Sequence, residues 1–359
     1  MIFRIDNKGI TEPHINLAME EFCLRSLPPK RSYFIVYVNR PSVIIGRHQN
    51  ILSEVDLRFA EQAELQVVRR ISGGGAVYHD FGNLNFCFIH GYNRRSLSNV
   101  RQTITPIQAA LVAMGVPAVF NGKNDLFITD KKISGNAQFS NTRRILVHGT
   151  LLFDSNLDYL KRALNPQTDH ITSIARKSVS SRVTNISPYL MPSFGIKAFR
   201  RRLLDTVAGQ YGGMQTVRLE DSQWQTIARL SEEKYLNWNW NYGKAPVFQI
   251  KRCNDGPLGR LSYSIDVENG CIAAIRFEKE GTGVNDTSRI EEGLLGAPFR
   301  REAIRVRLNQ LGSKVFDGPL NAIQLTDFLS ADLGRNRQPV LYRFSKINSE
   351  IRKGGISGW

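Results

Sequence analysis

The chain has 359 residues, of which 42% are hydrophobic, 22% charged and 9% aromatic. These fractions are typical of a globular protein and exclude a wholly disordered, collagen-like or coiled-coil chain. At roughly 150 residues per domain the length predicts two domains, and no apolar run reaches the roughly 18 residues that a membrane span needs.

The balance of charge is the unusual bulk property of the chain. Its 48 basic and 32 acidic residues give a net charge of +16, which attracts anionic partners such as nucleic acid, anionic lipid, a nucleotide or an acidic protein. The basic residues are scattered, so a generally basic surface and a dedicated patch both remain open. The four cysteines lack CxxC spacing, which indicates neither a zinc site nor a disulfide framework. The N-terminus lacks a secretory signal, and we expect a cytoplasmic protein.

The first elements are predicted from capping patterns and apolar periodicity. Asn16 is expected to cap a helix over 17–27, and Ser53 with Asp56 resembles a capping box for a helix that ends near residue 65. Strands are expected at 33–38, 43–45, 67–70, 84–88 and 146–153. Further helices are expected at 99–115, 194–211, 301–312 and 319–330.

A division into two lobes follows from the second half of the chain. The segment 166–189 has no sustained periodicity and is expected to be a functional or mobile connection. Asn269-Gly270 between two apolar runs predicts a hairpin over 259–278. The fold is therefore expected to be α+β, with a large mixed-sheet lobe through residue 248, flanked by helices, and a small α+β lobe after it.

The densest candidate site is the segment 69–80, RRISGGGAVYHD. Three successive glycines let backbone amides approach a ligand without side chains in the way, and amides turned inward form an anion nest. Arg70 offers a bidentate fork for a phosphate or a carboxylate. A tight, irregular strand connection accounts for the same residues equally well. The chain lacks GxxxxGK[ST], GxGxxG, HExxH and GxSxG, so the P-loop, Rossmann, zinc-protease and serine-hydrolase interpretations lose their usual support.

A second candidate is the predicted hairpin over 124–135. If a two-residue turn joins its strands, Asp125 and Phe127 share a face of the sheet with Lys132 and Ser134, and a carboxylate and an ammonium point into one space. A loop of odd length would reverse this pairing. Asp125 is a candidate to steer a magnesium ion or a substrate hydroxyl, or simply to pair with a lysine. A solvated strand lysine remains the alternative for Lys132.

Two histidines, His79 and His148, lie near these segments. A single histidine is more often a hydrogen-bonding strut than an acid or base. We therefore assign neither of them a proton-transfer role.

Taken together, these segments resemble the lipoate-protein ligase family, part of the superfamily of biotin and lipoate ligases and acyltransferases. The matching segments occur in family order and with family-like spacing, which is more specific than any one of them. They are GRHQN at 46–50, RISGGGAVYHDFGNLNF at 70–86, NDL at 124–126 with KISG at 132–135, HGTLL at 148–152, SRVTN at 181–185 and WNWNYGKAP at 238–246.

The resemblance implies a biotin/lipoyl ligase-like fold and a two-step adenylation. The carboxylate of lipoate attacks the α-phosphorus of ATP to give lipoyl-AMP and pyrophosphate, and a lysine of a lipoyl domain then takes the lipoyl group and releases AMP. Lys132 aligns with the active-site lysine of the family, whose ammonium could hold the carboxylate against the phosphate and stabilise developing charge. This role requires the proton, so we do not treat Lys132 as a covalent nucleophile.

The resemblance also implies which residues bind each substrate. ATP and lipoyl-AMP are assigned to Arg70, Gly75, Ala76, Val77, Tyr78 and Lys132. Lipoate is assigned to Gly73, Gly74, His79 and Lys132. Supporting positions are Asn83, Asp125, Ser134 and His148. Magnesium is implied by the triphosphate, but the sequence identifies no ligand for it.

The family pattern assigns domains and partners as well. Residues 1–248 are expected to form the catalytic lipoate- and ATP-binding domain, residues 249–345 a small accessory domain that moves between the two steps, and residues 346–359 a basic tail. Acceptors are expected to be lipoyl-domain proteins, namely 2-oxoacid dehydrogenase E2 subunits and the glycine cleavage H protein, with lipoate or octanoate as the small molecule. A basic surface would steer acidic lipoyl domains. We expect a monomer that binds neither nucleic acid nor a membrane.

Four alternatives compete with this interpretation. A lipoyltransferase that uses preformed lipoyl-AMP carries much the same motifs. An octanoyl transferase requires an active-site cysteine, and Cys87 is not placed where those families have theirs; biotin ligation is disfavoured because a GRGRxGR-type loop is absent. A noncatalytic polyanion-binding protein fits the charge but lacks an RRM-like aromatic pair, a zinc finger and a basic recognition helix.

Overall fold

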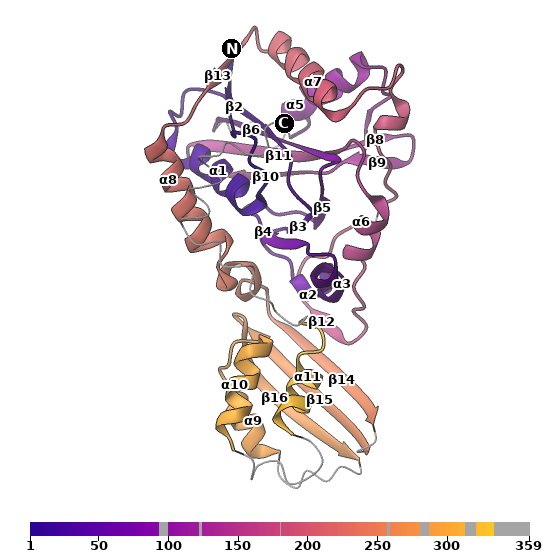
Figure 1. Cartoon of the computed structure of the whole chain (residues 1–359), viewed down its shortest axis with the longest axis vertical. Helices are drawn as coiled ribbons and strands as arrows, with labels where there is room; N and C mark the ends of the chain where they lie inside the picture. Colours follow the sequence, from indigo (N-terminus) through magenta and orange to yellow (C-terminus); the bar gives the residue numbers. More distant parts are fainter. Residues whose placement is uncertain are drawn as a thin grey trace.

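A computed structural model describes residues 1–92, 100–121, 124–179, 181–256, 259–280, 287–312 and 321–333. Figure 1 shows a wide lobe, which contains the N-terminus, and a narrower lobe stacked on it along the longest axis. The fold is α+β, as expected. The basic tail expected at 346–359 and the end of the expected accessory domain, 334–345, lie outside the described residues. Within the described ranges, no helix is long and apolar enough to cross a membrane.

A six-stranded mixed sheet forms the centre of the wide lobe. Its strand order is β10-β11-β6-β2-β1-β13, and all its pairs are antiparallel except those that β1 makes with β2 and with β13. The strands are β1 (Ile2–Ile5), β2 (Tyr33–Tyr37), β6 (Asn83–Gly91), β10 (Asn136–Ser140), β11 (Arg144–Leu152) and β13 (Met214–Val217). Strands β2 and β11 are buried at every position, as expected where both faces of a sheet are covered.

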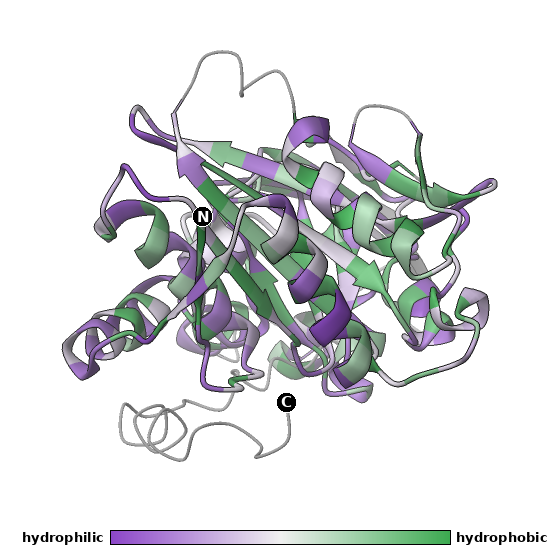
Figure 2. Ribbon diagram, turned by 90° about the horizontal axis from the view of Figure 1, so that it is seen from above, coloured by the Kyte–Doolittle hydropathy of each residue, from purple (hydrophilic) through white to green (hydrophobic). Residues whose placement is uncertain are grey.

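Helices cover both faces of this sheet, and the alternation of side chains along each strand separates two cores. Phe34, Val36 and Phe86 pack toward α5 (Val100–Ala113) and α7 (Ile196–Gln210). Their neighbours along the strands face α1 (Pro13–Ser26) and α8 (Asp221–Leu230). Figure 2, seen from the end of the molecule at which α5 and α7 lie, shows hydrophobic and hydrophilic residues side by side on these helices.

Two three-stranded sheets hold the segments singled out from the sequence. One has the order β4-β3-β5, with β3 (Ser42–Ile45), β4 (Gln66–Arg69) and β5 (Val77–His79), and the glycine-rich loop joins β4 to β5. The other has the order β7-β8-β9, with β7 (Val119–Asn121), β8 (Asp125–Ile128) and β9 (Lys131–Ser134). Short helices surround them: α2 (Ile51–Glu54), α3 (Leu57–Gln62), α6 (Leu157–Ala163) and the 3-10 turn Ser187–Tyr189.

In the described residues the narrow lobe is a four-stranded antiparallel sheet of order β12-β14-β15-β16, and helices cover it (Figure 1). Its elements are β12 (Ile171–Ser173), β14 (Phe248–Gly256), β15 (Gly259–Glu268), β16 (Cys271–Glu280), α9 (Ser288–Leu294), α10 (Arg301–Gln310) and α11 (Ala322–Leu329). Two π-helical turns, Ser231–Tyr235 and Asn239–Gly243, precede β14. Strand β12 comes from the long connection, and one hydrophobic cluster extends through both lobes. The division at residue 248 stays a prediction.

Two expected helix starts are wrong. Helix α1 begins earlier, at Pro13, because proline suits the first helical position, where no amide partner is needed. Asn16 therefore lies inside the helix, where its side chain donates to the carbonyl of Ile10 and to Asn39. The helix expected after Ser53 is two short helices, which Asn50 and Asp56 cap.

The hairpin at Asn269-Gly270 is confirmed, and its glycine is tightly enclosed. Both residues have positive φ, 50° and 75°, as a type I′ turn requires. A Cβ on Gly270 would lie 2.5 Å from the Cα of Gly243. Gly296, in the same lobe, has a similar φ of 71° but no atom within 4 Å of such a Cβ. The turn therefore packs directly against the connection between the lobes.

This pair of glycines separates backbone strain from steric fit. We expect Gly270→Ala to lower the free energy of unfolding by more than Gly296→Ala, since both replacements suffer a strain of about 1 kcal/mol but only the first meets backbone atoms. Urea unfolding monitored by circular dichroism measures both losses. Equal losses would mean that the contact between Gly270 and Gly243 contributes nothing to stability.

A partly buried histidine makes the stability of the wide lobe dependent on pH. His90, on β6, stacks on Phe88 and Tyr211 and lies 3.0 Å from the hydroxyl of Ser32. Burial lowers the pKa of His90 to about 4. The unfolded chain therefore binds a proton near pH 6.5 that the folded chain does not bind until about pH 4, and stability decreases as the pH falls through that interval.

We expect His90→Phe, which keeps the stacked ring and removes the titration, to lose less stability than the wild type between pH 7 and pH 5. The difference should be about 2 kcal/mol, the cost of keeping a histidine of this pKa neutral at pH 5. Urea unfolding at the two pH values measures it. The exposed His48 supplies the control, since His48→Gln should retain the wild-type pH dependence.

Candidate active site

Arg70 organises the glycine-rich loop from within. Its Nε donates to Ser72 Oγ at 2.9 Å, and its Nη1 donates to the carbonyl of Ile44 at 3.0 Å. Its Nη2 donates to the carbonyls of Gly73 and Gly75, both at 2.7 Å. The sequence predicts a fork open to an anion, but Arg70 is 4% exposed and its guanidinium is engaged by the loop. Burial lowers the pKa of Arg70 to about 10, which leaves it charged at neutral pH.

The preceding residue, Arg69, was missed by sequence reasoning. It is completely buried, and it donates to the carbonyls of Gly46 and Gln49 on one side and of Asn241 on the other. Burial lowers its pKa to about 10 as well. Two consecutive arginines ending a strand must point to opposite sides, and this alternation was the available signal.

The turn after β3 packs against the loop and requires a glycine. A Cβ on Gly46 would lie 2.1 Å from the carbonyl oxygen of Gly74. The residue Gly74 has a φ of 89°. The backbone amide of Arg47 donates to the carbonyl of Ser72 at 2.8 Å. The GRHQN segment therefore packs against the glycine-rich loop and supports it.

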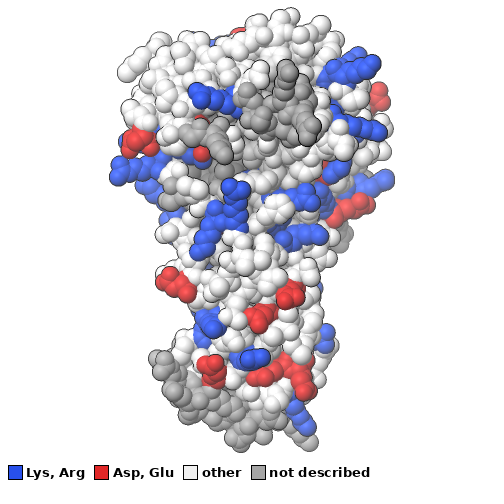
Figure 3. Space-filling model, turned by 180° about the vertical axis from the view of Figure 1, so that it is seen from behind, with Lys and Arg blue, Asp and Glu red and all other residues white. Residues whose placement is uncertain are grey.

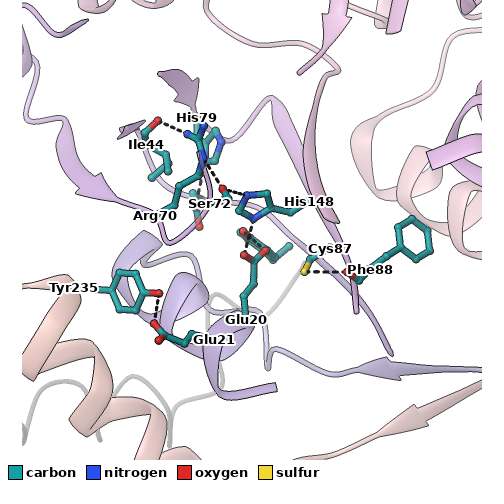
Figure 4. A network of polar contacts seen from close by, with 12 residues as sticks. Glu20, Glu21, Ile44, Arg70, Ser72, His79, Cys87, Phe88, His148 and Tyr235 are labelled. Carbon is teal, nitrogen blue, oxygen red and sulfur yellow. Dashed lines mark hydrogen bonds and ion pairs between the residues drawn. The ribbon is translucent and has the colours of Figure 1, made fainter. Parts of the chain in front are cut away.

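A buried polar chain continues from Arg70 into helix α1 (Figure 4). Ser72 Oγ lies 2.7 Å from Nε2 of His148, and Nδ1 of His148 lies 2.7 Å from Glu20 Oε2. The hydroxyl of Tyr37 donates to the other oxygen of Glu20 at 2.9 Å. Glu20, Ser72 and His148 are all less than one-tenth exposed.

The directions of the two outer hydrogen bonds in this chain follow from their chemistry. A guanidinium can only donate, so Ser72 Oγ accepts from Arg70. A carboxylate can only accept, so Nδ1 of His148 donates to Glu20, and the contact between Ser72 Oγ and Nε2 of His148 joins the two ends. Glu20 thereby supplies the negative charge that complements Arg70, and it too was missed.

The hairpin of β8 and β9 brings Lys132 and Asp125 together, as expected for a two-residue turn. Nζ of Lys132 lies 2.7 Å from Asp125 Oδ2, and Lys132 is paired with Phe127 across the strands. The expected face is wrong for Ser134, because a bulge pairs it with Leu126 and buries it. The side chain of Lys132 remains about a quarter exposed.

Lys132 and the glycine-rich loop meet at Gly135. A Cβ placed there would lie 3.2 Å from Nζ of Lys132 and 4.0 Å from a methyl of Val77. The backbone of Lys132 is fixed by segment 182–184, since its amide donates to the carbonyl of Arg182 at 2.7 Å. The structure thus brings the predicted lysine and the predicted loop into one site, where residues 73–77 remain partly or fully exposed.

Ser178, from the long connection, covers part of this loop. The amide of Ala76 donates to Ser178 Oγ at 2.9 Å, and the side chain of Gln49 donates to the same oxygen at 3.1 Å. The hydroxyl of Ser178 donates to Glu54, whose pKa is raised by burial. No sequence pattern indicated these contacts.

The remaining predicted residues lie behind the loop or at its end. His79 is 4% exposed, and burial, with Arg70 and His148 nearby, lowers its pKa to about 3, so it is neutral at physiological pH. Its Nδ1 lies 3.0 Å from the side-chain nitrogen of Asn39. The side chain of Tyr78 is in the hydrophobic core, where burial raises its pKa. Asn83 is buried at the start of β6 and donates to Asn85.

Comparison with known proteins identifies both lobes. The model for the lipoyl protein ligase A/B catalytic domain matches residues 12–208, and the model for the bacterial lipoate protein ligase C-terminus matches residues 245–331. The lipoate-protein ligase LplJ of Bacillus subtilis is 40% identical over 92% of this chain and 100% of its own length.

Two solved structures share the fold at 24% identity. A putative lipoate protein ligase from Thermoplasma acidophilum with bound lipoic acid has a TM-score of 0.60 and covers 68% of this chain and 99% of its own. A lipoate-protein ligase A bound with ATP has a TM-score of 0.58 and covers 68% of this chain and 100% of its own. With both family models matched in chain order and a relative aligned along its whole length, this chain belongs to the lipoate-protein ligase family.

Proposed function

We propose that this chain carries out the ligase reaction of its family where Lys132 meets the glycine-rich loop. In the first step the carboxylate of lipoate attacks the α-phosphorus of ATP, which gives lipoyl-AMP and releases pyrophosphate. In the second step the amine of an acceptor lysine attacks the acyl carbon, which forms an amide and releases AMP. The observation that carries this assignment is the convergence of Lys132, Gly135 and Val77 on one partly exposed site.

Lys132 acts in this proposal as a positioned ammonium. Nζ of Lys132 forms an ion pair with Asp125 Oδ2 at 2.7 Å, and the backbone of Lys132 is hydrogen-bonded to segment 182–184. The position of Lys132 is therefore defined before substrate binds. An ammonium placed between a carboxylate and a phosphate reduces their repulsion and stabilises the charge that develops on the phosphate oxygens. The positive charge also helps AMP to leave in the second step.

The backbone of Gly75, Ala76, Val77 and Tyr78 supplies the anion nest for the nucleotide, and Arg70 shapes it rather than contacting the phosphate. The amide of Ala76 becomes available to a phosphate only when Ser178 withdraws from it. Gly73, Gly74 and His79 remain the proposed contacts of lipoate, with His79 neutral and therefore compatible with an apolar chain.

Magnesium is implied by the triphosphate. The described residues contain no group of three or more His, Cys, Asp or Glu side chains that could hold a metal ion. Magnesium is commonly bound by one or two carboxylates together with substrate phosphates. The residues therefore fit an ion that arrives with the nucleotide, and Asp125 is the carboxylate closest to Lys132 that could complete its ligands.

The acceptors in this proposal are lipoyl-domain proteins, among them 2-oxoacid dehydrogenase E2 subunits and the glycine cleavage H protein, and octanoate shares the carboxylate that lipoate presents. The net charge of +16 supports an acidic acceptor, since opposite charges speed the encounter of two proteins. Figure 3 shows Lys and Arg side chains gathered over the middle of one face, above the narrow lobe. On the narrow lobe itself, Asp and Glu side chains lie among the basic ones.

Pyrophosphate release from ATP and magnesium with free lipoate, without acceptor, tests the role of Lys132. Lys132→Ala should lower the rate by about 10²-fold or more, as expected for loss of a charge that stabilises the transition state. The adjacent Lys131, which is exposed, gives a matched control, and Lys131→Ala should retain the wild-type rate. If the wild type releases no pyrophosphate but transfers the lipoyl group from synthetic lipoyl-AMP, the chain is a transferase and the first step is wrong.

The role of the buried polar chain is tested by two neighbouring carboxylates. Glu20 and Glu21 are both buried on α1 and both accept from a tyrosine hydroxyl, but only Glu20 leads through His148 to the loop. Glu20→Gln should raise the KM for ATP by about fivefold to tenfold, because a charge-assisted hydrogen bond becomes a neutral one worth about 1 kcal/mol less. Glu21→Gln should destabilise the fold with no change in this KM. Equal KM values in the two variants would refute the role.

A further inference from the structure

A cavity opens on the face of the central sheet that lies opposite the buried polar chain. Its volume is about 290 Å³, comparable with small-ligand pockets. Its apolar lining consists of Val38 and Leu84 together with Ile196 and Leu204 of α7. These side chains belong to the core on the α5 and α7 side, whereas Tyr37, the neighbour of Val38, points to the side of His148. The cavity is therefore distinct from the site around Lys132.

The polar lining of this cavity is mostly cationic. Arg4, Lys197, Arg200 and Arg201 border it, with Asp205 as the carboxylate in the lining. Ile196, Arg200 and Leu204 are spaced by four residues on α7 and so lie along one face of the helix. The helix thus places a guanidinium between two apolar side chains that face the cavity.

Arg200 is the unusual member of this set. Its Nε is buried without a hydrogen-bond partner, and within the described part of the chain no carboxylate forms an ion pair with it. Burial lowers the pKa of Arg200, the charge of Arg4 lowers it further, and Asp6 opposes this effect only in part. A buried N–H group without a partner is costly, and such groups mark places where a ligand supplies the missing interaction.

We propose that this cavity binds a medium-chain fatty carboxylate, with the alkyl chain over Val38 and Leu84 and the carboxylate on Arg200. An apolar interior beneath a cationic rim matches an anion at one end and a hydrocarbon at the other. A polyanion such as RNA fits less well, because the apolar interior offers it no polar partners. The site is independent of the ligase reaction and does not rest on the assignment of Lys132.

Calorimetric titration of the full chain with decanoate tests the proposal, in a Lys132→Ala background that weakens carboxylate binding at the ligase site. Decanoate should bind, and Arg200→Gln should weaken binding by about tenfold to a hundredfold, the range for loss of a charged hydrogen bond. Arg202, on the same helix, stacks on Phe194 outside the cavity, so Arg202→Gln should bind like its parent. Decylamine, a cation with the same chain, should not bind.

A second variant tests the location independently of the charge. Leu204→Trp fills the cavity and should abolish decanoate binding while Arg200 remains. Without ligand, Arg200→Gln should raise the melting temperature, because it removes an unpaired cation, and decanoate should then raise the melting temperature of the parent only. Binding that Arg200→Gln and Leu204→Trp leave unchanged would overturn the proposal, as would binding of decylamine equal to that of decanoate.

Discussion

Two consecutive buried arginines are the constraint on which the rest of the active site depends. A guanidinium carries only donors, so a buried one must be surrounded by acceptors. Arg69 collects carbonyls from the turn after β3 and from the connection to the narrow lobe, and Arg70 collects carbonyls from the glycine-rich loop. Arg69 ends β4 and Arg70 follows it, and because the two side chains bind different segments, this single dipeptide holds both the loop and the segment that supports it.

The buried positive charge of Arg70 is compensated by the carboxylate of Glu20, which does not contact Arg70 directly. Glu20 is linked to Arg70 through His148 and Ser72, with the guanidinium donating at one end of the chain and the carboxylate accepting at the other. Ser72, His148 and Glu20 have the order of a nucleophile triad. Ser72 is nevertheless completely buried and already accepts from Arg70, so the same geometry serves here to hold a loop. A Ser-His-Glu arrangement can therefore be assigned a catalytic or a structural role only when the burial of the serine and its further hydrogen-bond partner, here Arg70, are known.

The sequence predicted the parts of the site whose geometry is local. The sequence pairs Lys132 with Asp125 on condition of a two-residue turn, and the structure has that turn between β8 and β9. Three successive glycines allow an exposed backbone loop or a tight strand connection, and the loop is partly exposed. The sequence could not predict the bulge that buries Ser134, since a bulge depends on what the neighbouring strands require. Glu20, Arg69 and Ser178 were missed because their partners are far away in sequence. Strand β12 was missed for the same reason, since three residues carry no periodicity.

The long connection, residues 166–189, contacts three parts of the molecule that sequence patterns do not relate to one another. Its strand β12 completes the sheet of the narrow lobe, its Ser178 occupies the amide of Ala76, and the backbone around Val183 brackets Lys132. One stretch of chain, residues 171–183 apart from residue 180, therefore contacts the sheet of the narrow lobe, the glycine-rich loop and Lys132, although it shows no periodicity of its own.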